Sequence, residues 1–116
     1  MAFTYAKVLE ITTIAATVGV VYSNPASTTT YIRGIILHNG NTTAETVILY
    51  NVPDNAGSAG TPGTTNEFYY EIMPAYSTTI LEFPTPGIIL TATADTIQAD
   101  TTTASKCTIQ ILGATE

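Results

Sequence analysis

The side chains that could perform nucleophilic or acid–base chemistry are few in this sequence. It contains one histidine, His38, and one cysteine, Cys107. Catalysis by a thiolate or a serine needs a neighbouring base, and His38 is the one imidazole that could serve. No nucleophile elbow or other activating motif is visible. We therefore expect Cys107 to be a small buried apolar side chain and His38 to be a solvated residue at a strand end.

The sequence also gives little indication of a metal site or of a catalytic pair of carboxylates. A zinc or cupin-type site needs several converging His, Cys or carboxylate ligands, which one histidine and one cysteine do not provide. Glu67, Glu71 and Glu82 could furnish the carboxylate pair of a glycosidase, but their alternation indicates solvated strand faces. A loop calcium site is a minor alternative. Its candidate ligands are Asp54, Asp95 and Asp100. The sequence predicts no enzyme, no metal and no cofactor.

The charge balance excludes two classes of partner. The net charge is −6 at pH 7, and the three basic residues are Lys7, Arg33 and Lys106. Nucleic acids and anionic membrane surfaces are bound through clusters of Lys and Arg, which are missing here. No apolar run has transmembrane length, and no basic stretch followed by an apolar core opens the sequence. We expect no nucleic-acid or membrane partner, and assembly in a cytoplasm.

The surface is expected to be polar but weakly charged. Charged residues make up 10% of the chain and hydrophobic residues 45%, whereas an average soluble domain has about 25% charged residues. Thr, Ser and Asn must therefore provide most of the polar surface. This favours a protein that lies against neighbours in an assembly, although a robust neutral surface would look the same. With one cysteine, no internal disulfide can form.

Hydrophobic periodicity predicts strands, and no stripe of helical spacing appears. Short alternating segments are separated by turns rich in Gly, Pro and Asn. We predict an all-β fold, a single antiparallel β-sandwich of about eight strands over the 116 residues, with jelly-roll or immunoglobulin-like topology. The predicted strands cover residues 7–12, 17–22, 28–38, 45–52, 66–73, 77–83, 88–93, 96–100 and 105–112.

The stretch Tyr31–Val52 carries the central structural prediction. Two apolar, β-branched runs flank a polar break rich in Asn, Gly and Thr, which is a hairpin signal. Both faces of the second run are apolar, because Val47 and Leu49 alternate with Ile48 and Tyr50. A sheet with one face in water alternates more cleanly. The outward face is therefore covered either by a loop or by another subunit, and we favour a subunit contact at Ile48 and Tyr50.

Two flanking segments add further candidates for contact. Residues 1–6 form an N-terminal arm whose Phe3 and Tyr5 either reach a partner or cap the domain's own core. Residues 53–66 form a Gly-rich surface loop without the Gly-Lys-Ser/Thr ending of a nucleotide-binding loop. The chain has seven tyrosines and no tryptophan, which favours protein contacts over sugar stacking. The predicted interface residues are Phe3, Tyr5, Ile48, Tyr50 and Tyr69.

Four stretches follow one another in a pattern. They are Tyr-Ile-Arg-Gly-Ile-Ile-Leu-His-Asn from residue 31, Glu-Thr-Val-Ile-Leu-Tyr-Asn-Val-Pro from residue 45, Ile-Ile-Leu-Thr-Ala-Thr-Ala-Asp-Thr-Ile-Gln-Ala from residue 88 and Cys-Thr-Ile-Gln-Ile-Leu-Gly from residue 107. The pattern resembles small β-sandwich virion proteins of tailed bacteriophages and their prophage relatives. It covers roughly residues 28 to 113 and consists of strand and turn chemistry, without a catalytic fingerprint. It departs from the family at Ala94-Asp95, where Gly-Asp is expected.

The resemblance implies a non-enzymatic structural protein of the virion, assembled in the host cytoplasm. The first expectation is a capsid decoration or cement subunit that stabilises the particle by contacts with the major capsid protein or other virion proteins. A homo-oligomer such as a trimer would bury further apolar surface. The alternatives are a neck, tail or fibre component, including a host-adhesion role, and a carbohydrate-binding β-sandwich module.

Overall fold

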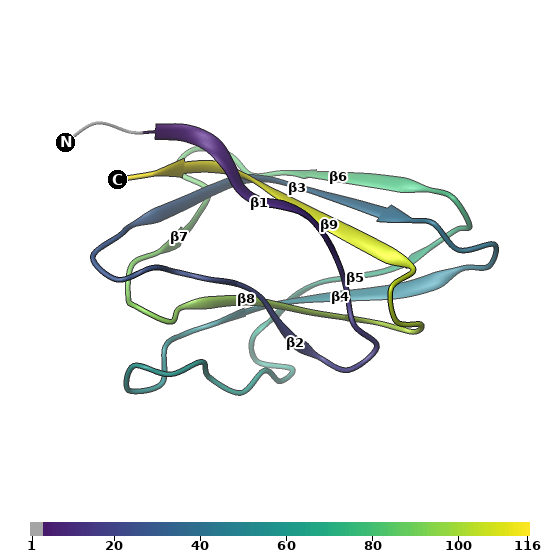
Figure 1. Ribbon diagram of the computed structural model, residues 1–116, viewed down its shortest axis with the longest axis horizontal. Helices are drawn as coiled ribbons and strands as arrows, with labels where there is room; N and C mark the ends of the chain where they lie inside the picture. Colours follow the sequence, from purple (N-terminus) through teal and green to yellow (C-terminus); the bar gives the residue numbers. More distant parts are fainter. Residues whose placement is uncertain (1–3) are drawn as a thin grey trace.

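The computed structural model describes residues 4–116, with side chains from Lys7 onward. In this part the chain forms nine strands in two antiparallel sheets. Figure 1 shows the sheets as two layers, one above the other. Residues 4–116 contain no helix that is long and apolar enough to cross a membrane. The predicted all-β sandwich is confirmed.

Each layer has its own strand order. Sheet A, the upper layer of Figure 1, has the order β1-β9-β3-β6, and β7 also pairs with β3. Sheet B, the lower layer, has the order β2-β8-β4-β5. The strands are β1 (Thr4–Thr13), β2 (Gly19–Ser23), β3 (Thr30–Asn39), β4 (Glu45–Val52), β5 (Glu67–Met73), β6 (Thr78–Glu82), β7 (Ile88–Leu90), β8 (Thr96–Thr101) and β9 (Cys107–Thr115).

The strand pairs are nested within one another. β1 pairs with β9, β2 with β8, β3 with β6 and β7, and β4 with β5. The chain therefore behaves as one long antiparallel ribbon whose successive pairs alternate between sheet A and sheet B. This winding is the jelly-roll arrangement. The structure thus decides between the two topologies that the sequence leaves open.

The predicted hairpin over Tyr31–Val52 is wrong. β3 and β4 belong to different sheets: β3 pairs with β9, β6 and β7, whereas β4 pairs with β5 and β8. Tight two-residue hairpin turns need positive φ angles, and no residue of the connection 40–44 has one. Because both edges of β3 are already occupied, the chain must cross to the other sheet after Asn39.

Asn39 holds the start of this crossover. Its side chain is fully buried, and Nδ2 donates toward the carbonyl oxygens of Met73 and Pro74, each at 3.1 Å. Its Oδ1 accepts the backbone N–H of Asn41 at 2.8 Å. One side chain therefore ties the end of β3 to the end of β5, which lies in the opposite sheet. A buried amide with these partners stabilises the crossover, because it leaves none of its polar atoms unpaired.

Glu45 holds the other end of the crossover. Its side chain is 1% exposed, Oε1 accepts the backbone N–H of Thr103 at 2.8 Å and Oε2 accepts the side-chain amide of Asn41 at 2.9 Å. Burial acts to raise the pKa of Glu45. The hydrogen bonds from Asn41 and Thr103, together with the charge of Lys106, outweigh burial and lower that pKa below its ordinary value.

The core between the sheets is aliphatic, and Cys107 belongs to it. The Cys107 side chain is fully buried, so its predicted role as a small apolar side chain is confirmed. Burial, with the nearby charge of Glu45, raises the pKa of Cys107 to about 11, which keeps the thiol protonated and unreactive at neutral pH. The largest apolar residues with 1% exposure or less are Ile14, Ile32, Ile35, Leu37, Leu49, Met73, Leu90, Ile97, Ile109 and Ile111.

A substitution at Gly113 tests whether the backbones of β9 and β3 approach each other closely. A Cβ atom at Gly113 would overlap the carbonyl oxygen of Tyr31, near the irregularity between Ile32 and Gly34 in the pairing of β3 with β9. We expect Gly113→Ala to lower the free energy of unfolding by about 3 kcal/mol, because backbone must shift. Gly63→Ala is the control, since a Cβ there meets nothing within 4 Å. Equal stability of both variants in urea denaturation would contradict the observed approach.

The Glu45 carboxylate makes stability depend on pH. Its folded-state pKa is lowered, so its contribution is present above the unfolded-state pKa and is lost as the pH falls through the folded-state value. We expect Glu45→Gln to cost about 1–3 kcal/mol at neutral pH and much less at about pH 3. Urea denaturation at both pH values measures this. Glu82→Gln, at an exposed site, should change neither value.

Candidate interaction surface

Two of the predicted interface residues lie together on the outside of sheet B. Ile48 and Tyr50 alternate along β4 with Val47 and Leu49, which are fully buried in the core. The side chains of Ile48 and Tyr50 therefore point away from sheet A, as the alternation predicts. Both are half-buried.

The N-terminal candidates cannot be placed in the same way. Phe3 lies outside the described residues, and so does the side chain of Tyr5, although its backbone belongs to β1. Their contact role stays a prediction.

Tyr69 lies on the opposite face of sheet B from Ile48 and Tyr50. It pairs with Leu49 on the core side of β5, and its hydroxyl donates to the carboxylate of Glu71. Burial, followed by this hydrogen bond, raises the pKa of Tyr69 to about 12. Glu71 also accepts the hydroxyl of Thr79 of β6 at 2.8 Å. These side chains link the two sheets, so Glu71 does not lie on the solvated face that the sequence predicts.

The outer face of sheet B carries side chains from all four of its strands, and Gln98, which lies between Val20 and Tyr50, is buried. Strand register places Ile48 between Tyr70 and Asp100, and Tyr50 opposite Glu67. Tyr70 is 56% exposed and Ile72 is 61% exposed. We call this surface the Tyr50 face. Its members are Val20, Thr46, Ile48, Tyr50, Glu67, Tyr70, Ile72 and Asp100.

Two carboxylates flank the ring of Tyr50. Burial raises the pKa of Tyr50, and the charges of Asp100 and Glu67 raise it further. Burial and the charge of Glu67 also raise the pKa of Asp100. The Tyr50 face therefore concentrates negative potential around an aromatic ring. It contains no Lys or Arg side chain among the residues that the structure describes.

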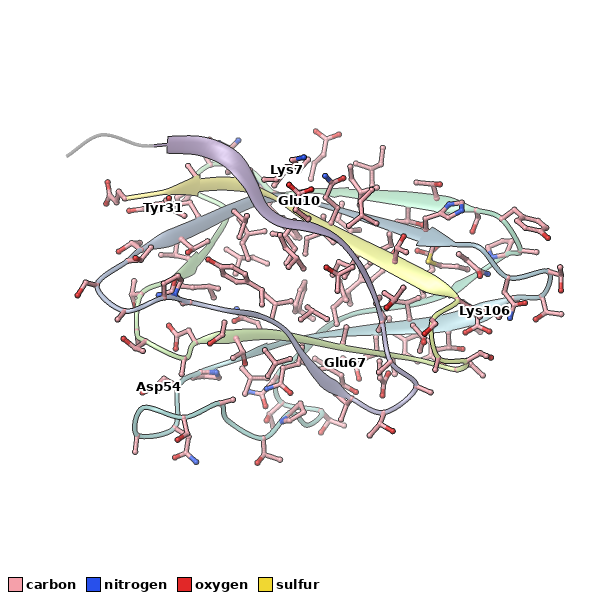
Figure 2. All side chains as sticks on the ribbon, viewed as in Figure 1. Lys7, Glu10, Tyr31, Asp54, Glu67 and Lys106 are labelled. Atoms are coloured by element: carbon pink, nitrogen blue, oxygen red, sulfur yellow. The ribbon has the colours of Figure 1, made fainter. Side chains whose placement is uncertain are left out.

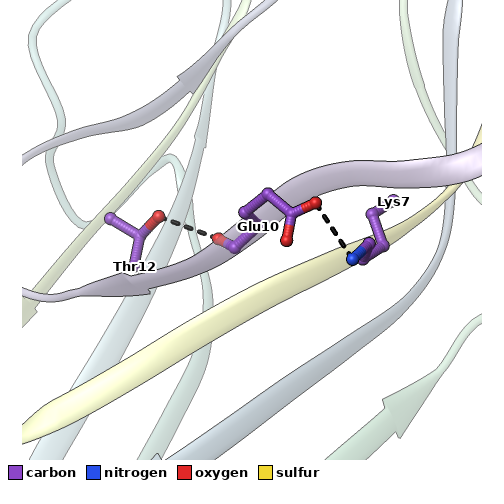
Figure 3. A network of polar contacts seen from close by, with 3 residues as sticks. All are labelled: Lys7, Glu10 and Thr12. Carbon is purple, nitrogen blue, oxygen red and sulfur yellow. Dashed lines mark hydrogen bonds and ion pairs between the residues drawn. The ribbon is translucent and has the colours of Figure 1, made fainter.

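The basic residues lie elsewhere. Lys7 and Arg33 belong to β1 and β3 of sheet A, and Lys106 lies between β8 and β9. Figure 2 shows Lys7 above the upper layer, far from Glu67 at the lower one. Within residues 4–116 the one salt bridge joins Lys7 Nζ to Glu10 Oε1 at 3.0 Å, as Figure 3 shows. Neither carboxylate of the Tyr50 face therefore has an ion-pair partner in the described chain.

The Gly-rich loop covers one end of the outer face of sheet B. The side chain of Gln98 in β8 is 3% exposed and donates to the carbonyl oxygen of Gly60 at 3.0 Å. Asp95 Oδ1 accepts the N–H of Asp54 at 2.8 Å, which fixes the start of the loop. Figure 1 shows this loop beneath the lower layer. A loop thus covers part of the outward face, while Tyr70 and Ile72 stay more than half exposed.

The fold does not bring together the other residues that could perform acid–base, nucleophilic or metal-binding chemistry. His38 lies on the outer side of sheet A, with Nδ1 2.8 Å from Thr78 Oγ1, whereas Cys107 points into the core. Glu67 and Glu71 lie on opposite faces of β5. In the described part of the chain no group of three or more His, Cys, Asp or Glu side chains could hold a metal ion.

Sequence reasoning missed part of the Tyr50 face. Tyr70 and Ile72 alternate with Tyr69, so the sequence indicates that they share a face, but the predicted contact residue is Tyr69. Asp100 carries no such signal, because its place beside Ile48 depends on the register of β8 against β4. Comparison of the sequence with protein-family models and with curated proteins found no match.

Because the side chain of Tyr50 points outward, a substitution there should disturb assembly more than folding. We expect Tyr50→Lys to change the free energy of unfolding by less than about 1 kcal/mol, because the new ammonium group would lie between Glu67 and Asp100. Leu49→Lys is the control, and its buried unpaired charge should prevent folding. Urea denaturation of the isolated protein measures both. A large folding defect in Tyr50→Lys would show that this face is part of the core.

Proposed function

We propose that this chain is a non-enzymatic structural protein of a tailed-bacteriophage virion, and that it decorates or cements the capsid. The observation that carries the proposal is the Tyr50 face, where exposed Tyr70 and Ile72 adjoin Ile48 and Tyr50. Apolar and aromatic side chains grouped on a sheet face mark a contact surface.

The outer face of sheet A provides a second contact surface. Ile11 is 68% exposed and Ile80 is 63% exposed, and Ile80 pairs with Ile36 across β6 and β3. Apolar surfaces on both outer layers suit a subunit that has neighbours on two sides. This agrees with a decoration protein that contacts both the capsid and other copies of itself.

The fold supports the proposal without deciding it. Jelly rolls occur in viral capsid proteins and in lectins, and a shared fold does not fix a function. The resemblance of residues 28 to 113 to small phage virion proteins favours the first of these classes. A rigid sandwich with crossovers held by buried Asn39 and Glu45 offers the fixed geometry that a cement subunit needs.

Purified particles from a strain that carries this gene test the proposal. We expect mass spectrometry to find the chain in DNA-filled heads separated from tails, and a particle reconstruction to place it on the capsid surface. Particles that lack the chain should release DNA at a lower temperature, because cement contacts are missing. Particles with Tyr50→Lys should resemble them, whereas particles with Gly63→Ala, whose added Cβ meets nothing within 4 Å, should match the wild type.

Two outcomes would contradict the capsid assignment. Recovery of the chain from isolated tails, with none in the heads, would make it a neck, tail or fibre component. Its absence from purified particles would remove the virion role altogether. In that case, glycan binding that Tyr70→Ala abolishes would identify a carbohydrate-binding module.

A further inference from the structure

We infer that the Tyr50 face docks a cationic segment of another protein, with a Lys or Arg side chain seated over Tyr50 between Glu67 and Asp100. The inference rests on the proposed function, because it names the chemistry of the partner at that contact surface. It is carried by charge complementarity and by the arrangement of the two carboxylates around one ring.

Strand register fixes this arrangement. Glu67 lies opposite Tyr50 across the β4–β5 ladder, and Asp100 lies opposite Ile48 across the β4–β8 ladder. Facing side chains on one side of a sheet are about 5 Å apart and diagonal ones about 7 Å. Glu67 is therefore a direct neighbour of Tyr50 and Asp100 a diagonal one, on the strands at either side of β4. Gln98, which lies directly opposite Tyr50 on β8, is buried and bonded to Gly60. A cation above the ring would lie within the field of both carboxylates, each of which raises the pKa of Tyr50.

The free protein leaves these charges uncompensated. Asp100 is half-buried, and the like charge of Glu67 raises its pKa in addition to burial. A bound cation would replace this repulsion by attraction, and the electron-rich face of Tyr50 would add a cation–π contact. A guanidinium group fits best, because it pairs with a carboxylate through its planar fork and stacks on an aromatic ring. Exposed Tyr70 and Ile72 offer apolar contacts for the rest of the segment.

A second copy of this chain offers no basic segment, because its three basic residues, Lys7, Arg33 and Lys106, are far apart in the sequence. Lys7 is already paired with Glu10, and Arg33 Nε donates to the carbonyl oxygen of Phe83 at 3.2 Å. The charge of Lys106 helps to lower the pKa of the buried Glu45 carboxyl group. A two-fold contact between two Tyr50 faces would bring like charges together, which is unfavourable. The occupant is therefore a different protein that presents a basic segment.

A pair of synthetic peptides tests the inference on the intact protein. One peptide alternates arginine with glycine, and the other replaces each arginine by citrulline, which has the same shape without the charge. We expect the arginine peptide to shift the NMR signals of Ile48, Tyr50 and Tyr70, and to bind less well as salt rises. The citrulline peptide should cause no comparable shifts.

Two double variants with the same net charge locate the site. Glu67→Gln with Asp100→Asn should weaken binding of the arginine peptide about tenfold, since two ion pairs are lost. Glu10→Gln with Glu82→Gln removes two carboxylates from sheet A and should leave the affinity unchanged. Dispersed NMR spectra establish that both variants are folded. The inference would be overturned if the two double variants bound the arginine peptide equally well. It would also be overturned if the citrulline peptide bound as well as the arginine peptide, or if the NMR shifts were spread over residues near all carboxylates.

The two proposals fail in different ways. If the chain is a capsid component but the arginine peptide does not bind the Tyr50 face, the cationic partner is wrong and the virion role stands. If the peptide binds as expected but the chain is absent from particles, the virion role is wrong and the chemistry of the face stands.

Discussion

β3 is hydrogen-bonded along both of its edges, to β9 on one side and to β6 and β7 on the other. A strand with no free edge cannot pair with the segment that follows it, so the chain crosses to sheet B through residues 40–44. Buried Asn39 and Glu45 hold that crossover from its two ends. The remaining pairs are nested around this crossover: β5 pairs with β4, β6 and β7 with β3, β8 with β4 and β2, and β9 with β3 and β1. The position of β4, and with it the Tyr50 face, is thus set by the pairing of β3.

The sequence predicts the strands well and their partners poorly. Each predicted segment overlaps an observed strand, because alternation and turn residues are local properties. The hairpin over Tyr31–Val52 fails because the same local signals fit a crossover between sheets equally well. Which strand lies beside β3 depends on β9, whose sequence lies more than sixty positions away. Local patterns cannot contain that information.

The same limit applies to the site. Alternation alone places Ile48 and Tyr50 outward, and the burial of Val47 and Leu49 agrees with it. Alternation also shows that Tyr69 and Tyr70 face opposite ways, but not which of them is outside. Glu67 and Asp100 join the face through register, which the sequence does not reveal. Glu71, an acidic residue predicted to be solvated, instead bonds with Tyr69 and Thr79 between the sheets.

Tyr50, Glu67 and Asp100 come from β4, β5 and β8, and none of these strands alone presents the face. Along the chain, β5, β6 and β7 separate β8 from β4, and β6 and β7 belong to the other sheet. The surface is therefore complete only when β5 and β8 have both paired with β4 in the correct register. A partner that recognises it would distinguish finished subunits from incomplete or misfolded ones. If the chain is the virion subunit proposed above, this contact would admit only folded copies to the assembling particle.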